Sequence, residues 1–220
     1  MLYIVSTPIG NLKDITLRAL ETLKAADLIA AEDTRHTRRL LQHYDIKTPL
    51  TSYFEHNKFK KADALLEMLK QGKEIALVTD AGTPGISDPG YHLIRLVKQN
   101  DIPLTVVPGA CALIAALSAS GLPPDRFIFL GFLPARQKAR RDKLRGAAGE
   151  KGTVIFYESP HRLLKTLRDI QEIIGAAQVV CARELTKKFE EIKSGTPGEL
   201  MEYFLKHKPR GEFVVLFNIF

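Results

Sequence analysis

Short apolar runs alternate with segments of helical periodicity along the first half of the chain. The apolar runs suit buried strands and lie at residues 2–6, 27–31, 74–79 and 104–107. Apolar side chains recur at helical spacing between these runs, at residues 15–23, 34–44, 58–71, 91–99 and 110–119. Such alternation is typical of a mostly parallel sheet covered by helices. We therefore expect an N-terminal α/β domain over residues 1–119.

A second α/β pattern follows the segment Ser120–Asp125, whose glycine and paired prolines predict a linker. Strands are expected at residues 127–130, 153–157, 178–182 and 212–218, with a charged helix between the first two. Ser159 and Pro160 suit the N-cap and first position of a helix through Ile174. Thr196–Glu199 reads as a capping box. We expect a C-terminal α/β domain with a mixed sheet over residues 120–220.

Three turns rich in proline and glycine follow predicted parallel strands. The longest, Val78–Gly90, contains three glycines and two prolines, and the others are Ser6–Asn11 and Val107–Ala112. Glycine lets a ligand approach the main chain closely, and proline holds the backbone path. Ligands in open α/β sheets bind at the carboxyl ends of the strands. We expect the three turns to converge on one ligand pocket.

Several well-known motifs are absent from these turns. None of them reads GxGxxG or GxxxxGK[ST], which argues against a nicotinamide-dinucleotide oxidoreductase and a P-loop nucleotidase. The sequence contains no HExxH or GxSxG, so a zinc protease or a hydrolase elbow lacks support. The two cysteines, Cys111 and Cys181, have no partner at zinc-ligand spacing, and we expect no metal.

The charge balance favours an anionic partner. The chain carries 32 Lys and Arg against 25 Asp and Glu, a net charge of +7 with a pI of about 9.4. Basic residues cluster at 35–39, 58–61 and 136–145, which makes a nucleic acid a serious candidate. The N-terminal sequence has no basic leader, and no apolar run approaches the length of a membrane span. A cytoplasmic protein without membrane contact is therefore expected.

The longest motifs resemble one protein family along essentially the whole chain. They lie in order at Tyr3–Leu12, Ala31–Thr37, Thr79–Gly90, Val107–Gly109, Phe156–Arg162 and Ala182–Lys187. The chain resembles the bacterial small-subunit (16S) ribosomal RNA cytidine 2′-O-methyltransferases of the tetrapyrrole (corrin/porphyrin) methylase superfamily. Members often carry a further small helical domain after the last strand, whereas this sequence stops at Phe220. The resemblance therefore suggests a short member or a truncated chain.

The resemblance implies a fold, a donor and a set of donor-contacting residues. The expected architecture is two α/β domains with a cofactor cleft between them, in a homodimer that binds S-adenosylmethionine. The substrate would be ribosomal RNA or the small ribosomal subunit. Matched motif by motif, the cofactor-binding residues are Pro8, Asp80, Ala81, Gly82, Thr83, Cys111, Ala112, Tyr157, Leu185, Glu212 and Phe213.

Polar residues beside these motifs are candidates for catalysis and RNA binding. Methyl transfer to a ribose hydroxyl needs in-line alignment and a base within hydrogen-bond reach of the hydroxyl proton. Glu32 or Glu158 is expected to be that base or to position the ribose, with Lys187 as a further catalytic candidate. Phosphate contacts are expected from Arg35, His36, Arg38, Arg39, His161, Arg162, Arg183 and Lys187.

Two other readings of function stay open at this point. The same fold could methylate a tetrapyrrole or a protein side chain, although the net charge and the segments Glu32–Thr37 and Glu158–Arg162 argue against this. The protein could also be a non-catalytic RNA-binding or assembly factor. Binding of S-adenosylmethionine separates a methyltransferase from such a factor.

Overall fold

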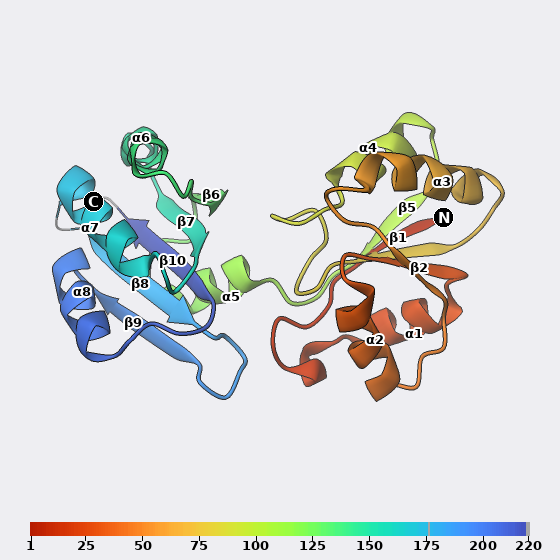
Figure 1. Ribbon diagram of the computed structural model, residues 1–220, viewed down its shortest axis with the longest axis horizontal. Helices are drawn as coiled ribbons and strands as arrows, with labels where there is room; N and C mark the ends of the chain where they lie inside the picture. Colours follow the sequence, from red (N-terminus) through yellow and green to blue (C-terminus); the bar gives the residue numbers. More distant parts are fainter. Residues whose placement is uncertain (176, 219–220) are drawn as a thin grey trace. The chain divides into compact units, whose positions relative to one another are not determined.

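The computed structural model describes residues 1–175 and 177–218 and divides the chain into two compact units, Met1–Cys111 and Ala112–Phe220. Both units are α/β (Figure 1). The division falls eight residues before the boundary expected from the sequence, at 119, because helix α5 (Ala112–Ser120) packs on the sheet of the second unit. The proline-containing segment after α5 therefore does not separate the two units.

The first unit is a parallel five-stranded sheet in the order β3-β2-β4-β1-β5. Its strands are β1 (Leu2–Val5), β2 (Leu28–Ala31), β3 (Leu50–Ser52), β4 (Ile75–Val78) and β5 (Leu104–Val107). The helices are η1 (Leu12–Asp14), α1 (Leu17–Ala25), α2 (Thr34–His43), α3 (Lys58–Lys70) and α4 (Tyr91–Gln99). The four strands and four helices expected in this part of the chain are present, and β3 is an additional edge strand.

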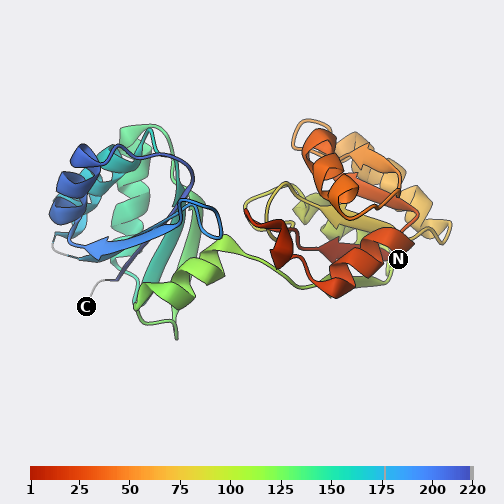
Figure 2. The ribbon, with the colours of Figure 1, turned by 90° about the horizontal axis from the view of Figure 1, so that it is seen from below.

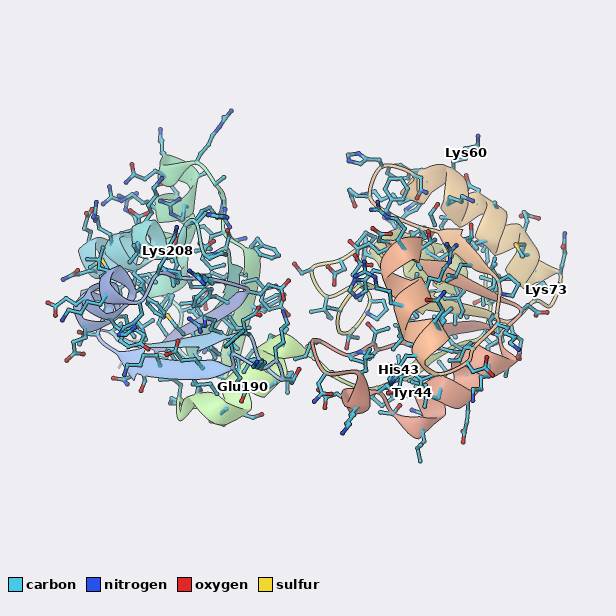
Figure 3. The ribbon with its side chains drawn as sticks, turned by 60° about the horizontal axis from the view of Figure 1, so that its bottom comes forward. His43, Tyr44, Lys60, Lys73, Glu190 and Lys208 are labelled. Atoms are coloured by element: carbon cyan, nitrogen blue, oxygen red, sulfur yellow. The ribbon has the colours of Figure 1, made fainter. Side chains whose placement is uncertain are left out.

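Two apolar cores lie on opposite faces of this sheet. One joins Leu2 and Leu77 of the sheet to α3 and α4, and the other joins Val5 and Val78 to α1 and α2. Figure 1 shows α3 and α4 on one side of the strands and α1 and α2 on the other. The end of α2 is held to η1, because the Tyr44 hydroxyl donates a 2.6 Å hydrogen bond to the carbonyl oxygen of Leu12 (Figure 3). Covering both faces leaves the carboxyl edge of the sheet for ligands.

The second unit is a mixed sheet in the order β6-β7-β10-β8-β9. β6 (Phe127–Phe132) and β7 (Thr153–Glu158) are parallel, and the pairs that involve β8 (Gln178–Arg183), β9 (Glu191–Gly195) and β10 (Phe213–Asn218) are antiparallel. Helices α6 (Gln137–Ala148), α7 (Leu163–Ile174) and α8 (Pro197–Lys206) enclose the main core on one face. Helix α5 runs along the other face (Figure 2).

Two details differ from the sequence prediction. Helix α7 begins at Leu163 rather than at Pro160, after a turn in which the carbonyl oxygen of Ser159 accepts hydrogen bonds from the amides of Arg162 and Leu163. Strand β9 was not expected, since its polar sequence lies at the exposed edge of the sheet. The capping box at Thr196 and Glu199 is present as expected and starts α8.

Candidate active site

The three proline- and glycine-rich turns meet at the carboxyl edge of the first sheet. Strands β4, β1 and β5 are adjacent and parallel, so their following turns leave the sheet side by side. The amide of Thr7 donates to the carbonyl of Gly82 at 2.9 Å, and the amide of Gly82 donates back to Thr7 at 3.1 Å. The hydroxyls of Ser6 and Thr83 lie 2.8 Å apart, and the Thr83 hydroxyl also donates to the carbonyl of Ala110 at 3.4 Å. The three turns therefore meet as expected, and the ligand pocket stays a prediction.

Glycine is favoured at two places where these turns touch. Gly82 has φ of +86°, a left-handed conformation that strains other residues. A side chain at Gly109 would start 3.0 Å from Cβ of Ser6. The amide and the carbonyl of Gly82 both form hydrogen bonds with Thr7, so Gly82 shapes the turn. The neighbouring residue Ala81 is exposed, whereas Gly82 is buried.

The carboxylates of Glu32 and Asp80 tie the end of β2 to the end of β4. Oε2 of Glu32 accepts a 2.6 Å hydrogen bond from the hydroxyl of Thr79 and a 3.4 Å bond from the amide of Asp80. Within the described part of the chain, Oε1 of Glu32 accepts no hydrogen bond. Asp80 in turn accepts a 3.0 Å bond from the amide of Asp33. Burial raises the pKa of Asp80, and the negative charge of Glu32 adds to the effect.

Asp88 is a third carboxylate in the same place, and it is not among the site residues expected from the sequence. Burial raises the pKa of Asp88 to about 6, and the charges of Glu32 and Asp80 contribute, while a hydrogen bond with the Thr79 side chain opposes the shift. Carboxylates with perturbed pKa values gather at functional sites. The signal available in the sequence was a second aspartate, after Asp80, in the turn that follows β4.

The basic residues expected to bind RNA from the first unit lie at the start of α2. Arg35, His36, Arg38 and Arg39 are all exposed. Asp33 caps the helix through a 2.8 Å bond from the amide of Arg35, and its carboxylate pairs with the Arg35 guanidinium at 2.6 Å. Hydrogen bonds from Arg35 hold the pKa of Asp33 well below its usual range. Arg35 is thus already paired in this conformation.

The candidate residues of the second unit also gather at one edge of their sheet. Phe213, the first residue of β10, lies opposite Glu158 at the end of β7 and Arg183 at the end of β8. Phe213 and Leu185 are buried, and Tyr157 is half-buried with its ring against Phe129 at a centroid distance of 4.9 Å. These apolar groups can form one wall of a ligand site.

Glu158 is enclosed by three partners. Its side chain is 0% exposed, and its oxygens accept from the Ser159 amide at 2.7 Å and the Thr166 hydroxyl at 2.6 Å. Arg162 completes the set with an ion pair of 2.7 Å, and its guanidinium also donates to the carbonyl of Leu133 at 3.0 Å. A carboxylate so fully engaged suits a structural support for Arg162 better than a proton acceptor. His161 is exposed beside this group.

Two loops of the second unit are joined by a charged cluster around Lys187. Its ammonium contacts Glu184 at 2.9 Å and Glu212 at 2.8 Å, and the Glu184 carboxylate accepts a 2.9 Å bond from the Glu212 amide. Gly211 allows this approach, because a Cβ there would lie 2.3 Å from Cδ of Glu184. Burial lowers the pKa of Lys187, but the hydrogen bonds to Glu212 and Glu184 outweigh it and raise the pKa above its ordinary value. A lysine kept charged cannot take a proton.

Other candidates occupy less constrained places. Pro8 is buried in the turn after β1, whereas Cys111 and Ala112 are half-buried where the chain passes from the first unit to the second. Arg183 faces Glu191 at 3.5 Å, and its Nε is buried without a hydrogen-bond partner in the described part of the chain. Among the described residues, no group of three His, Cys, Asp or Glu side chains could hold a metal ion. No helix of that part is long and apolar enough to cross a bilayer.

Comparison with known proteins assigns the fold and the family. The sequence profile of the tetrapyrrole (corrin/porphyrin) methylases matches residues 1–201. The chain belongs to the tetrapyrrole methylase family. Its resemblance to the ribosomal RNA branch of that family is confirmed as well. The Haemophilus influenzae protein named ribosomal RNA small subunit methyltransferase I is 54% identical over 219 residues, covering 98% of this chain and 77% of that protein. The Thermotoga maritima protein of the same name is 51% identical over 217 residues, covering 99% and 97%.

Solved structures of other enzymes share the fold at low identity. A diphthine synthase superposes with a TM-score of 0.77 at 13% identity, covering 99% of this chain and 88% of that one. Uroporphyrin-III C-methyl transferase from Thermus thermophilus, in a complex with S-adenyl homocysteine, gives a TM-score of 0.67 at 17% identity, covering 99% and 96%. The expected two-sheet α/β architecture is confirmed. Membership of this methylase family also supports S-adenosylmethionine as the methyl donor.

Proposed function

We propose that this tetrapyrrole methylase transfers a methyl group from S-adenosylmethionine to the ribose 2′-oxygen of a cytidine in small-subunit ribosomal RNA. The observation that carries the proposal is identity of 51% to 55% over nearly the whole chain with proteins named ribosomal RNA small subunit methyltransferase I. The net charge of +7 agrees with an RNA substrate. The uroporphyrin and diphthine enzymes match only at 13% to 19% identity, so they support the assignment of the fold and not of a substrate.

The residues of the three turns fit a donor held against main-chain groups. Gly109 lies in close contact with Ser6, and the main chains of Thr7 and Gly82 are hydrogen-bonded to each other. These two contacts give the turns a fixed backbone path. Asp80 and the exposed Ala81 lie at the open end of that path. In the proposal, the donor-binding residues are Pro8, Asp80, Ala81, Gly82, Thr83, Cys111, Ala112, Tyr157, Leu185, Glu212 and Phe213. S-adenosylmethionine supplies an electrophilic methyl group on a sulfonium centre, so no further activation of the leaving group is needed.

Glu32 is the base that the geometry favours. Thr79 and the Asp80 amide hold one carboxylate oxygen in place, and the other oxygen is left to receive a proton. The proton of the 2′-hydroxyl would pass to Oε1 of Glu32 as the oxygen forms its bond to the methyl carbon. Glu158, with its three buried partners, would instead hold Arg162 toward a phosphate. Lys187 would remain charged and stabilise the loops around the site.

Labelled donor tests the proposal directly. The protein is incubated with methyl-labelled S-adenosylmethionine and either small ribosomal subunits or free small-subunit RNA, and the labelled nucleotide is mapped. Label is expected on the ribose of one cytidine, where the methyl group protects the adjacent phosphodiester from alkaline cleavage. Label on a base, or binding of the donor without any transfer to RNA, would overturn the ribose assignment. Failure to bind the donor would favour a non-catalytic assembly factor.

A further inference from the structure

We propose that a cluster of aromatic and basic side chains at the carboxyl edge of β3 binds unpaired bases of the RNA substrate by stacking. The cluster, which we call the aromatic patch, consists of Phe54, Phe59, Tyr91, His92, Lys58 and Lys60. The inference rests on the proposed RNA substrate and adds a binding surface to it. None of these six residues is among the individual donor-binding or RNA-binding residues expected above, although Lys58 and Lys60 belong to the basic cluster at residues 58–61.

The aromatic residues are concentrated rather than scattered. Residues 1–111, which the structure describes in full, contain three Phe or Tyr residues that are exposed by more than a third, and all three belong to the patch. Tyr91 is 70% exposed and Phe59 is 63% exposed. Phe59, at the start of α3, lies edge-on to His92, at the start of α4, with ring centroids 4.7 Å apart. Exposed apolar side chains gathered from several elements mark interaction sites.

The scaffold beneath the patch is held by hydrogen bonds. Buried Tyr53 links the two sides, because its hydroxyl accepts a 3.2 Å bond from the amide of Leu93 in α4. Asn57 closes the turn before α3, since its side-chain oxygen accepts from the Phe54 amide at 2.8 Å and its amide donates to Ser52 at 3.3 Å. Rings on such a support lose little conformational entropy when a base stacks on them.

Basic groups surround the rings. The ammonium of Lys58 lies 5.3 Å from the centroid of the Phe59 ring and pairs with Glu55. Lys60 is exposed and extends outward from the same turn of α3 (Figure 3). Aromatic rings for bases together with cations for phosphates are the combination that proteins use to bind single-stranded nucleic acid.

The position of the patch connects it to the candidate active site. β3, β2 and β4 are neighbours in the parallel sheet, so Phe54, Glu32 and Asp80 all follow strands that end at the same edge. Tyr91 follows directly on Gly90, and the turn that begins with Asp80 is folded so tightly that a Cβ on Gly90 would lie 2.9 Å from the amide nitrogen of Gly85. A strand of RNA whose target ribose reaches Glu32 can therefore extend across the patch.

The charge of the patch favours RNA over a second copy of this chain. Two copies meeting through this surface would bring Lys58, Lys60 and His92 of one against the same groups of the other, in a protein that already carries +7. RNA offers the opposite charge and flat bases in one ligand. We therefore assign the patch to RNA and leave self-association as an outcome of the test.

Binding of unstructured oligouridine tests the patch in the full-length protein. The variant Phe59→Ala/Tyr91→Ala is expected to lose about tenfold or more in affinity, since stacking contributes roughly 1–3 kcal/mol per base. Phe59→Tyr/Tyr91→Phe should keep near-wild-type affinity because both rings remain. Phe127→Ala is the matched control: this phenylalanine is 40% exposed and begins β6 in the second unit, far along the chain from the patch. Wild-type protein should prefer oligouridine to an RNA duplex of equal length.

The outcomes separate the patch from the proposed function. Equal affinity of the alanine variant and the wild type would overturn the patch and leave the RNA substrate standing. No binding of any RNA by wild-type protein that still binds S-adenosylmethionine would overturn both. Loss of a dimer in sedimentation by the alanine variant, with RNA affinity unchanged, would assign the surface to a second copy and overturn the inference.

Discussion

The hydroxyl of Thr79 donates a 2.6 Å hydrogen bond to Oε2 of Glu32, and so fixes a carboxylate at the junction of β2 and β4. If Glu32 is the base, Glu32→Gln should lower kcat by about a hundredfold or more, the usual range for general-base catalysis. Thr79→Val removes the support of Glu32 together with the hydrogen bond to Asp88, and it should lower kcat by roughly tenfold with little change in KM. Thr79→Ser keeps the hydroxyl donor and should keep the activity. Single-turnover methylation of small subunits measures these rates.

A hydroxyl elsewhere in the unit serves as control for this pair. Thr48 donates a 2.6 Å bond to the carbonyl of Leu23, before β3 and away from the carboxyl edge, so Thr48→Val should leave kcat unchanged. Near-wild-type turnover of Glu32→Gln would exclude Glu32 as the base. A fall in donor affinity equal to the fall in kcat/KM would instead assign Glu32 to donor binding.

Asp88 should make the stability of the protein depend on pH. Its pKa is raised to about 6 by burial and by Glu32, whereas the unfolded chain has the ordinary value near 3.8. Between these two values the folded state binds more protons than the unfolded state, so the free energy of unfolding should fall as pH rises from about 4 to about 6. Asp88→Asn removes the cost of the charge and should stabilise the protein at pH 7 by about 2 kcal/mol.

Denaturant unfolding of wild type and Asp88→Asn at several pH values measures this effect. The difference between the two proteins should be small at pH 4 and largest above pH 6. Asp63→Asn is a suitable control, because Asp63 is an exposed aspartate on α3. A constant difference between wild type and Asp88→Asn across the range would show that the carboxyl of Asp88 does not titrate as described.

Substitution of Glu158 tests whether this residue has a structural or a catalytic role. Its carboxylate is fully buried against Arg162 and Thr166, so Glu158→Gln should cost about 3 kcal/mol of unfolding free energy, as breaking a buried ion pair does. The exposed pair of Arg126 and Glu150, 3.4 Å apart, gives the comparison, and Glu150→Gln should cost less than about 1 kcal/mol. Turnover per folded molecule should fall far less for Glu158→Gln than for Glu32→Gln. A hundredfold loss of kcat with unchanged stability would make Glu158 the base.

The sequence predicted the parts of the fold that follow a strong local pattern. The buried strand β4 is a continuous apolar run in the sequence. The glycines that follow it indicate a tight turn of the backbone. The edge strands β3 and β9 could not be predicted in this way, because they are short or polar and owe their conformation to pairing with a neighbour. The expected start at Pro160 falls in a hydrogen-bonded turn that precedes α7, and the helix itself begins at Leu163.

In the candidate site, too, the sequence predicted the features that depend on local motifs and missed those that depend on tertiary packing. Motif spacing placed Asp80 and Thr83 in the turn after β4, and the structure brings Ser6 to Thr83 as adjacent strands require. The environment of Asp88 depends on Glu32, which lies 56 positions earlier and reaches it only through the pairing of β2 with β4. Long-range packing of this kind leaves no periodic signal in a sequence.

Exposed arginines on α2 provide a test of the RNA surface that is independent of the aromatic patch. Arg38 and Arg39 are exposed and form no ion pair with any residue that the structure describes, whereas Arg35 is held by Asp33. Each phosphate contact that is lost should reduce the log–log salt dependence of single-strand binding by roughly 0.7. Arg38→Gln/Arg39→Gln should therefore flatten the slope by about 1.4 and weaken binding at low salt.

Lys73 offers a matched change of charge at the other end of the sheet. It precedes β4, pairs with Asp27 at 3.0 Å, and lies at the tip of the loop after α3 (Figure 3). Lys73→Gln removes one positive charge at the amino edge of the strands, so the slope should stay at the wild-type value. If Lys73→Gln flattened the salt slope of RNA binding as much per charge as Arg38→Gln/Arg39→Gln does, RNA binding would depend on the net charge of the protein rather than on a surface of α2.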